Sequence, residues 1–208
     1  MLDTESIARY AWQRAALDWG YTIENELYAK AIGRRIQDTK NILLMAFGKS
    51  FPFDEIRKRK QKYIEEYIAE HGIPKKPGLI KLLDLIDELS LLKAIGSSTE
   101  KKSVIRKLTL SGLIQRFDIL VCGDEIQNGK PAPDIFLTTA ERLHVPAEQC
   151  LVLEDSETGI EAAHTAGMIP VMVPDLIEPS KKTSALAYKI YPTLNEVTTF
   201  LYTWSARH

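Results

Sequence analysis

The spacing of apolar residues divides the chain into two parts. Up to residue 72, apolar side chains recur at the period of helices that bury one face. This spacing predicts helices over residues 4–19, 23–31, 36–47 and 54–72. Gly20, Gly48 and Gly72 stand where helices would end, and Asp54 is the expected N-cap of the fourth helix. We therefore expect the first third of the chain to be helical.

From residue 73 onward, short apolar runs alternate with helical stretches. Strands are expected over residues 91–95, 118–121, 150–153, 169–173 and 188–190, with helices before, between and after them. Such alternation is typical of an α/β fold with a doubly wound parallel sheet. The expected layout is a core of residues 1–9 and 73–208, interrupted by a helical insert over residues 10–72.

The composition argues against nucleic acid and membrane partners. Hydrophobic residues make up 45% and charged residues 26% of the chain, and the net charge of −1 provides no basic field. No apolar stretch approaches the ~20 residues of a membrane span, and no signal-peptide pattern opens the chain. Cys122 and Cys150 are expected to be separate thiols in a protein of the reducing cytoplasm.

Polar residues follow three of the predicted strands. In an open parallel sheet, ligands bind beyond the carboxyl ends of the strands. The hydroxyl residues Ser97 and Ser98 follow the first strand, where they would either cap the next helix or bind a phosphate. Lys130 lies between a glycine and a proline, so it is either a solvated loop residue or a cation that balances phosphate charge.

Glu154 and Asp155 stand side by side at the end of an apolar strand. Burying a carboxylate without a partner costs several kcal/mol, so a partner is expected. Hard oxygen ligands of this kind suit Mg²⁺. The alternative is that Asp155 or Ser156 only caps the following helix, and we favour the metal site.

Taken together, these segments resemble the second, third and fourth motifs of the haloacid dehalogenase superfamily, in its β-phosphoglucomutase and phosphoglycolate-phosphatase-like branch. The segments GKPAPDIF (129–136) and VLEDSETGIEAAHTAGM (152–168) are specific, whereas GSS (96–98) is weak alone. The resemblance covers the whole chain. It implies a Rossmann-like core with an inserted α-helical cap domain.

The resemblance also implies a role for each site residue. Ser97, with Ser98 beside it, would bind the phosphate, and Lys130 would neutralise the phosphoryl group in transfer. Asp155 and Glu154 would hold Mg²⁺. The family's first motif, Asp-x-Asp-Gly-x, supplies a nucleophile that forms an aspartyl-phosphate, and here the sequence opens just after it.

On this alignment Asp3 is not the nucleophile but an acidic residue a few positions further on. We expect Met1 to be an internal methionine of a longer polypeptide, because loss of a central strand would cost about as much as a domain's whole stability. A chain without the nucleophile would lose most of its activity.

The expected function is Mg²⁺-dependent hydrolysis of a small phosphorylated metabolite, a sugar phosphate. The alternatives are β-phosphoglucomutase-type phosphotransfer and a catalytically inactive phosphate-binding or regulatory protein. Beyond a small phosphorylated substrate we expect no nucleic acid or membrane partner, and a monomer or homodimer. Arg34 and Arg35 would either grip a second anionic group of the substrate or lie on the surface.

Overall fold

The computed structural model describes residues 1–31, 36–175 and 178–205. These residues form two compact units, one of Leu2–Pro74 and the other of Met1 with Lys75–His208. We call them the helical unit and the α/β unit. In the described residues, no helix is both long enough and apolar enough to cross a membrane.

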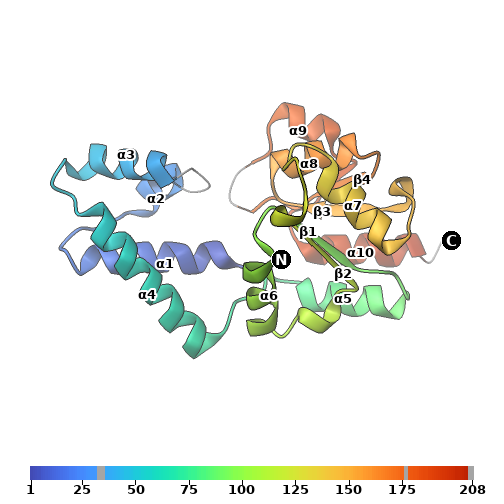
Figure 1. Cartoon of the computed structure of the whole chain (residues 1–208), viewed down its shortest axis with the longest axis horizontal. Helices are drawn as coiled ribbons and strands as arrows, with labels where there is room; N and C mark the ends of the chain where they lie inside the picture. The colour runs from blue at the N-terminus through green and yellow to red at the C-terminus, as the bar shows by residue number, and fades with distance from the viewer. Residues whose placement is uncertain (32–35, 176–177, 206–208) are drawn as a thin grey trace. The chain divides into compact units, whose positions relative to one another are not determined.

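In its described residues, the helical unit contains four helices, as the apolar spacing predicts (Figure 1). They are α1 (Thr4–Leu17), α2 (Asn25–Ala31), α3 (Ile36–Phe47) and α4 (Phe53–His71). Asp3 caps α1 by accepting a hydrogen bond from the Ser6 backbone N–H at 3.3 Å. Gly72 ends α4 in the left-handed region, with φ of 72°, as expected for a residue without a β-carbon.

The prediction that Asp54 is the N-cap of α4 was wrong. Pro52 occupies that position and makes no side-chain cap, and the helix begins at Phe53. Asp54 therefore lies within the first turn, where its carboxylate pairs with Lys40 Nζ at 2.7 Å. The positive end of the helix dipole also stabilises this negative charge. Phe53 and Ile56 are buried on the inner face of this turn, and their packing sets where the helix starts.

The core of the helical unit is apolar and aromatic, with polar contacts at its edge. Trp12 lies 5.5 Å from Phe53, measured between ring centroids, and both are buried. At the edge, Asp18 accepts hydrogen bonds from Arg59 Nε at 2.8 Å and from the Tyr63 hydroxyl at 2.9 Å. The Arg59 guanidinium, and then the Tyr63 hydroxyl, lower the pKa of Asp18. These contacts fasten α4 to the end of α1.

The α/β unit alternates helices with short parallel strands, which confirms the predicted fold class. Its strands are β1 (Ala94–Ser97), β2 (Ile119–Cys122), β3 (Leu151–Glu154), β4 (Ile169–Met172) and β5 (Lys189–Ile190). Its α-helices are α5 (Leu79–Glu88), α6 (Lys101–Leu110), α7 (Asp134–Leu143), α8 (Glu157–Thr165), α9 (Lys181–Leu186) and α10 (Leu194–Ser205).

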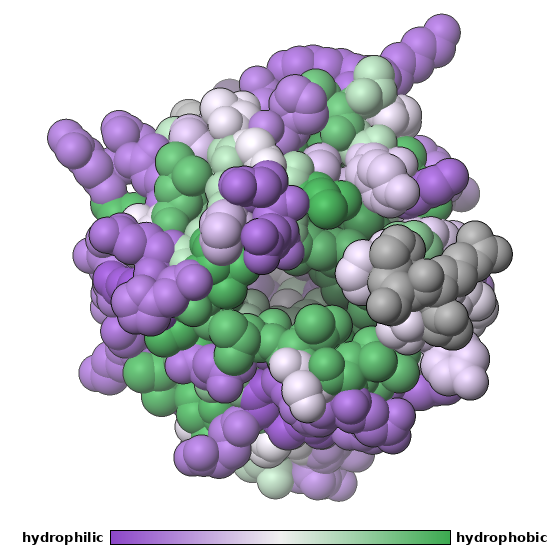
Figure 2. Space-filling view, turned by 90° about the vertical axis from the view of Figure 1, so that its right-hand side faces the viewer, coloured by the Kyte–Doolittle hydropathy of each residue, from purple (hydrophilic) through white to green (hydrophobic). Residues whose placement is uncertain are grey.

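The strands form two parallel sheets, with the orders β1-β2 and β3-β4-β5. In the described residues β1 pairs only with β2, and β3 only with β4. Helices α5 and α10 pack together on one side of the strands, whereas α7 and α8 lie on the other (Figure 1). Figure 2 shows one face of the molecule, with a central hollow ringed by apolar residues and an outer rim of polar ones.

One core connects the two sheets. Val121 of β2 and Val152 of β3 belong to the same buried cluster, together with α7 residues such as Ile135 and α8 residues such as Ala162. Cys122 and Cys150 are free thiols, as predicted. Burial raises the pKa of both, so neither is an activated thiolate.

The first strand lies further along the chain than the apolar run suggested. We predicted residues 91–95, and the strand covers Ala94–Ser97. Leu91 and Leu92 are exposed. The Lys93 backbone N–H donates to Asp118 Oδ2 at 2.8 Å, so its acceptor is a side chain and not the backbone of a neighbouring strand.

Candidate active site

Lys130 joins the carboxyl ends of β1 and β3. Its ammonium donates to the Gly96 carbonyl oxygen at 3.3 Å and pairs with Glu154 Oε2 at 3.1 Å. The Phe136 ring lies below it, 4.6 Å from Nζ to the ring centroid. Only 9% of the Lys130 side chain and 13% of the Glu154 side chain are exposed. Lys130 is therefore a nearly buried cation and not a solvated loop lysine.

Glu154 is held from a second direction by the start of α8. Ser156 donates its hydroxyl proton to Glu154 Oε1 at 2.5 Å and accepts from the Gly159 backbone N–H at 3.1 Å, as the N-cap of the helix. A β-carbon at residue 159 would lie 2.2 Å from the Glu154 carboxyl carbon. Gly159 is therefore needed for close approach and not for an unusual φ.

Asp155 stands next to this pair and keeps contact with solvent. Desolvation by the surrounding protein, and then repulsion from the Glu154 carboxylate, raises the pKa of Asp155. A bound divalent cation would relieve the repulsion between these two adjacent carboxylates. The described residues contain no group of three or more His, Cys, Asp or Glu side chains that would enclose a metal on protein ligands alone. Mg²⁺ is commonly held by only one or two carboxylates plus waters and substrate phosphate, so this pair fits it.

The hydroxyl loop after β1 lies at the same end of the strands. Ser97 Oγ accepts from the Thr99 backbone N–H at 3.2 Å, which leaves its hydroxyl proton able to reach an acceptor. The Ser98 carbonyl packs so closely on Gly123 that a β-carbon there would lie 2.3 Å from it. Because Ser97 follows Gly96 directly, the Lys130 contact brings this loop and Glu154 together.

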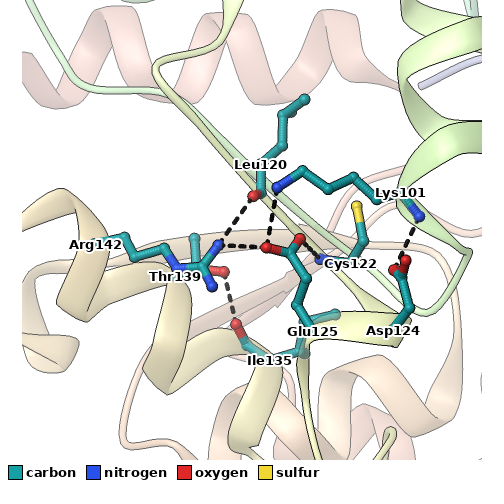
Figure 3. Close-up of polar contacts among 8 residues, drawn as sticks. All are labelled: Lys101, Leu120, Cys122, Asp124, Glu125, Ile135, Thr139 and Arg142. Carbon is teal, nitrogen blue, oxygen red and sulfur yellow. Dashed lines mark hydrogen bonds and ion pairs between the residues drawn. The ribbon is translucent and has the colours of Figure 1, made fainter.

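A network around Glu125 was not anticipated from the sequence (Figure 3). Glu125 Oε1 accepts from Lys101 Nζ at 3.0 Å and from Arg142 Nη1 at 2.8 Å, and Oε2 accepts from the Cys122 backbone N–H at 3.1 Å. Asp124 accepts from the Lys101 backbone N–H at 2.9 Å. This network ties the end of β2 to α6 and α7. The segment that carries Lys130 lies between Glu125 and α7 in the chain.

The other residues considered add nothing to this group. Arg34 and Arg35 lie outside the described residues. His164 lies within α8, and His71 and His144 stand at helix ends.

Fold and site together define an α/β protein that gathers hydroxyls, an ammonium and two carboxylates at the carboxyl ends of parallel strands. The chain belongs to the haloacid dehalogenase-like hydrolase family, which matches it over residues 1–173.

Three relatives illustrate the family. A phosphorylated carbohydrates phosphatase of Thermotoga maritima is 30% identical over 172 residues, covering 81% of this chain and 77% of the relative. A fructose-1-phosphate phosphatase of Escherichia coli is 27% identical over 175 residues, covering 83% of this chain and 90% of the relative. The solved structure of a putative β-phosphoglucomutase of Thermotoga maritima has a TM-score of 0.82 at 27% identity, covering 98% of this chain and 94% of the other.

Substituting Glu125→Gln tests the network in Figure 3. Arg142, and then Lys101, lowers the pKa of Glu125, so its charge stabilises the fold above its unfolded pKa of about 4.3. We expect urea unfolding at pH 7 to show a loss of about 1–3 kcal/mol. The difference from wild type should shrink as the pH falls through the depressed folded pKa. A difference of equal size at pH 7 and pH 3 would contradict this.

Gly159→Ala tests the packing against Glu154. The new β-carbon forces the Glu154 carboxylate away from Lys130 and Ser156, so we expect a loss of about 1–3 kcal/mol in urea unfolding. Gly129→Ala is the matched control, because a β-carbon there meets nothing within 4 Å. Its change should stay within about 0.5 kcal/mol. Equal losses in the two variants would argue against a role for the Glu154 contact.

Proposed function

We propose that this protein is an Mg²⁺-dependent phosphohydrolase that acts on a small phosphorylated metabolite, a sugar phosphate. The observation that carries the proposal is the nearly buried Lys130 ammonium, held between Gly96 O and Glu154 at the carboxyl ends of two strands. A cation fixed at this place is suited to a phosphate, whose transfer depends on charge neutralisation and positioning.

In this proposal each site residue has a defined role. Ser97 and Ser98 donate hydrogen bonds to phosphate oxygens, and Lys130 balances their charge. Asp155 and Glu154 hold the Mg²⁺, which when bound adds Lewis-acid stabilisation of the phosphoryl oxygens. Glu154 also orients Lys130, because one carboxylate oxygen faces the ammonium while the other accepts from Ser156. The attacking carboxylate is not among the residues assigned here.

The names of two relatives support the substrate class that we propose. The names of the phosphorylated carbohydrates phosphatase and of the fructose-1-phosphate phosphatase describe sugar phosphates as their substrates. We propose the same class for this chain, with the helical residues 10–72 as the cap domain of the family layout.

One similar structure is named a putative β-phosphoglucomutase, and this favours a second candidate reaction. Product analysis with a hexose 1-phosphate separates the two. Release of inorganic phosphate supports the hydrolase, whereas formation of hexose 6-phosphate supports the mutase.

Lys130→Met is the direct test of the phosphate site. We expect hydrolysis of p-nitrophenyl phosphate with Mg²⁺ to fall on the order of 10²–10³-fold, and calorimetry to show weaker binding of inorganic phosphate. Lys102→Met removes an exposed ammonium and should change neither measurement. Urea unfolding of Lys130→Met separates lost binding from lost folding, because removal of the ammonium leaves the nearly buried Glu154 carboxylate without its cation. Phosphate bound without turnover would favour the inactive phosphate-binding alternative.

Asp155→Asn tests the metal site. Removing the charge of Asp155 should raise the Mg²⁺ concentration needed for half-maximal phosphate binding or activity by on the order of tenfold or more. Asp118→Asn, a change at the start of β2 instead of at the site, is the control. An unchanged Mg²⁺ requirement would exclude Asp155 as a ligand.

A further inference from the structure

Lys130 rests on an aromatic ring as well as on its two hydrogen-bond acceptors. Its Nζ lies over the Phe136 ring, 4.6 Å from the centroid, which is within the ~6 Å over which the face of such a ring attracts a cation. Phe136 stands in the first turn of α7 and is buried. The attraction is stronger where water is excluded, so this contact holds the ammonium more firmly than a surface pair of the same kind.

The two hydrogen bonds of Lys130 are long for a charged donor. Its Nζ lies 3.3 Å from the Gly96 carbonyl oxygen and 3.1 Å from Glu154 Oε2. A charge-assisted N–H···O bond usually measures about 2.7–2.9 Å between its heavy atoms. The lysine stem is also flexible, so two long bonds leave the ammonium room to shift. The Phe136 ring supplies the third contact that limits this movement.

The ring attracts the ammonium without adding a negative charge. In the part of the chain that the structure describes, Gly96 and Glu154 accept from two of its three N–H donors, and the third has no acceptor. A second carboxylate in place of the ring would compete with a phosphate for the same cation. Phe136 is an aromatic hydrocarbon, so it can hold the charge in place and still leave one donor for a bound anion.

The same ring also lies against the end of β1. A β-carbon on Gly96 would lie 3.4 Å from Cδ1 and Cε1 of Phe136, so the ring packs closely on the backbone of this strand. The carbonyl that accepts from Lys130 belongs to the same glycine, and Ser97 follows it directly. The ring therefore sets the spacing between the ammonium and the hydroxyl loop.

We propose that Phe136 is a positioning residue of the phosphate site, whose ring face holds the Lys130 ammonium beside the Gly96 carbonyl with one N–H donor left for a phosphate oxygen. This role rests on the proposed function, because that function supplies the phosphate. Phe136 acts through Lys130 and does not itself contact the substrate. Without the ring, the ammonium would occupy a range of positions, and phosphoryl transfer depends on where the compensating charge is placed.

NMR of the whole 208-residue chain with ¹³C-labelled lysine tests the contact itself. Protons above an aromatic ring are shielded, so we expect the Hε signals of Lys130 at lower chemical shift than those of exposed lysines such as Lys102. Lys130→Met assigns the signal. Phe136→Leu should return it to the range of exposed lysines, whereas Ile135→Val, which trims another buried residue of α7, should leave it in place. A Lys130 signal that Phe136→Leu does not move overturns the proposal.

A graded series at residue 136 separates the charge distribution of the ring from its size. Mono-, di- and trifluorinated phenylalanines keep nearly the same shape, while each fluorine weakens the negative face of the ring. We expect the affinity for inorganic phosphate with Mg²⁺, and kcat for p-nitrophenyl phosphate, to fall step by step, with about a tenfold loss in Phe136→Leu. Ile135→Val should match wild type in both. A merely structural role would leave the whole fluorinated series at wild-type values, and that result overturns the proposal even if Phe136→Leu does not fold.

The two sets of measurements separate this role from the proposed function. Phosphate binding and turnover that persist unchanged in Phe136→Leu and in the fluorinated series count against Phe136 alone. A wild-type chain that neither binds phosphate nor hydrolyses p-nitrophenyl phosphate counts against the proposed function. In that case a Lys130 signal that moves in Phe136→Leu still supports the hold of the ring on the ammonium.

Discussion

The candidate site depends on the ion pair between Lys130 and Glu154. The ladders of the described residues join β1 to β2 and β3 to β4, so the ends of β1 and β3 meet through this ammonium and not through a shared ladder. Each charge is nearly buried, and an unpaired buried charge costs several kcal/mol. The Lys130 ammonium therefore stays at the strand ends because the Glu154 carboxylate and the Gly96 carbonyl both accept hydrogen bonds from it.

Neighbouring residues hold this pair in place. Ser156 connects Glu154 to the start of α8, and Gly159 leaves the space that the carboxylate occupies. On the other side, the carboxylate of Glu125 ties β2 to the flanking helices through Arg142 and Lys101. The segment that carries Lys130 is thus held by charge-assisted hydrogen bonds at Glu125, where it begins, and at Lys130 itself. Such bonds are stronger than neutral ones.

The two units use a half-buried or buried lysine in different ways. Lys130 in the α/β unit has a carboxylate and a carbonyl as partners, and it rests on Phe136. Lys60 in the helical unit rests on Trp12 and shares a cavity with Glu5. The first lysine has two hydrogen-bond acceptors beside it, whereas the second packs on an aromatic ring.

The alternation of helices and strands, and hence the fold class, could be predicted from the sequence, because local periodicity records which face of each element is buried. It also pointed to Ser97, Lys130, Glu154 and Asp155 as strand-end residues, because parallel strands place their carboxyl ends at one edge. Their roles in binding remain predictions. The near-complete burial of Lys130 against Glu154 became visible only in the folded chain, as did the pairing of Glu125 with cations from α6 and α7. The cavity shared by Glu5, Tyr28 and Lys60 likewise comes from residues far apart in sequence. Such contacts depend on how helices pack, and side-chain packing across elements leaves no periodic signal along the chain.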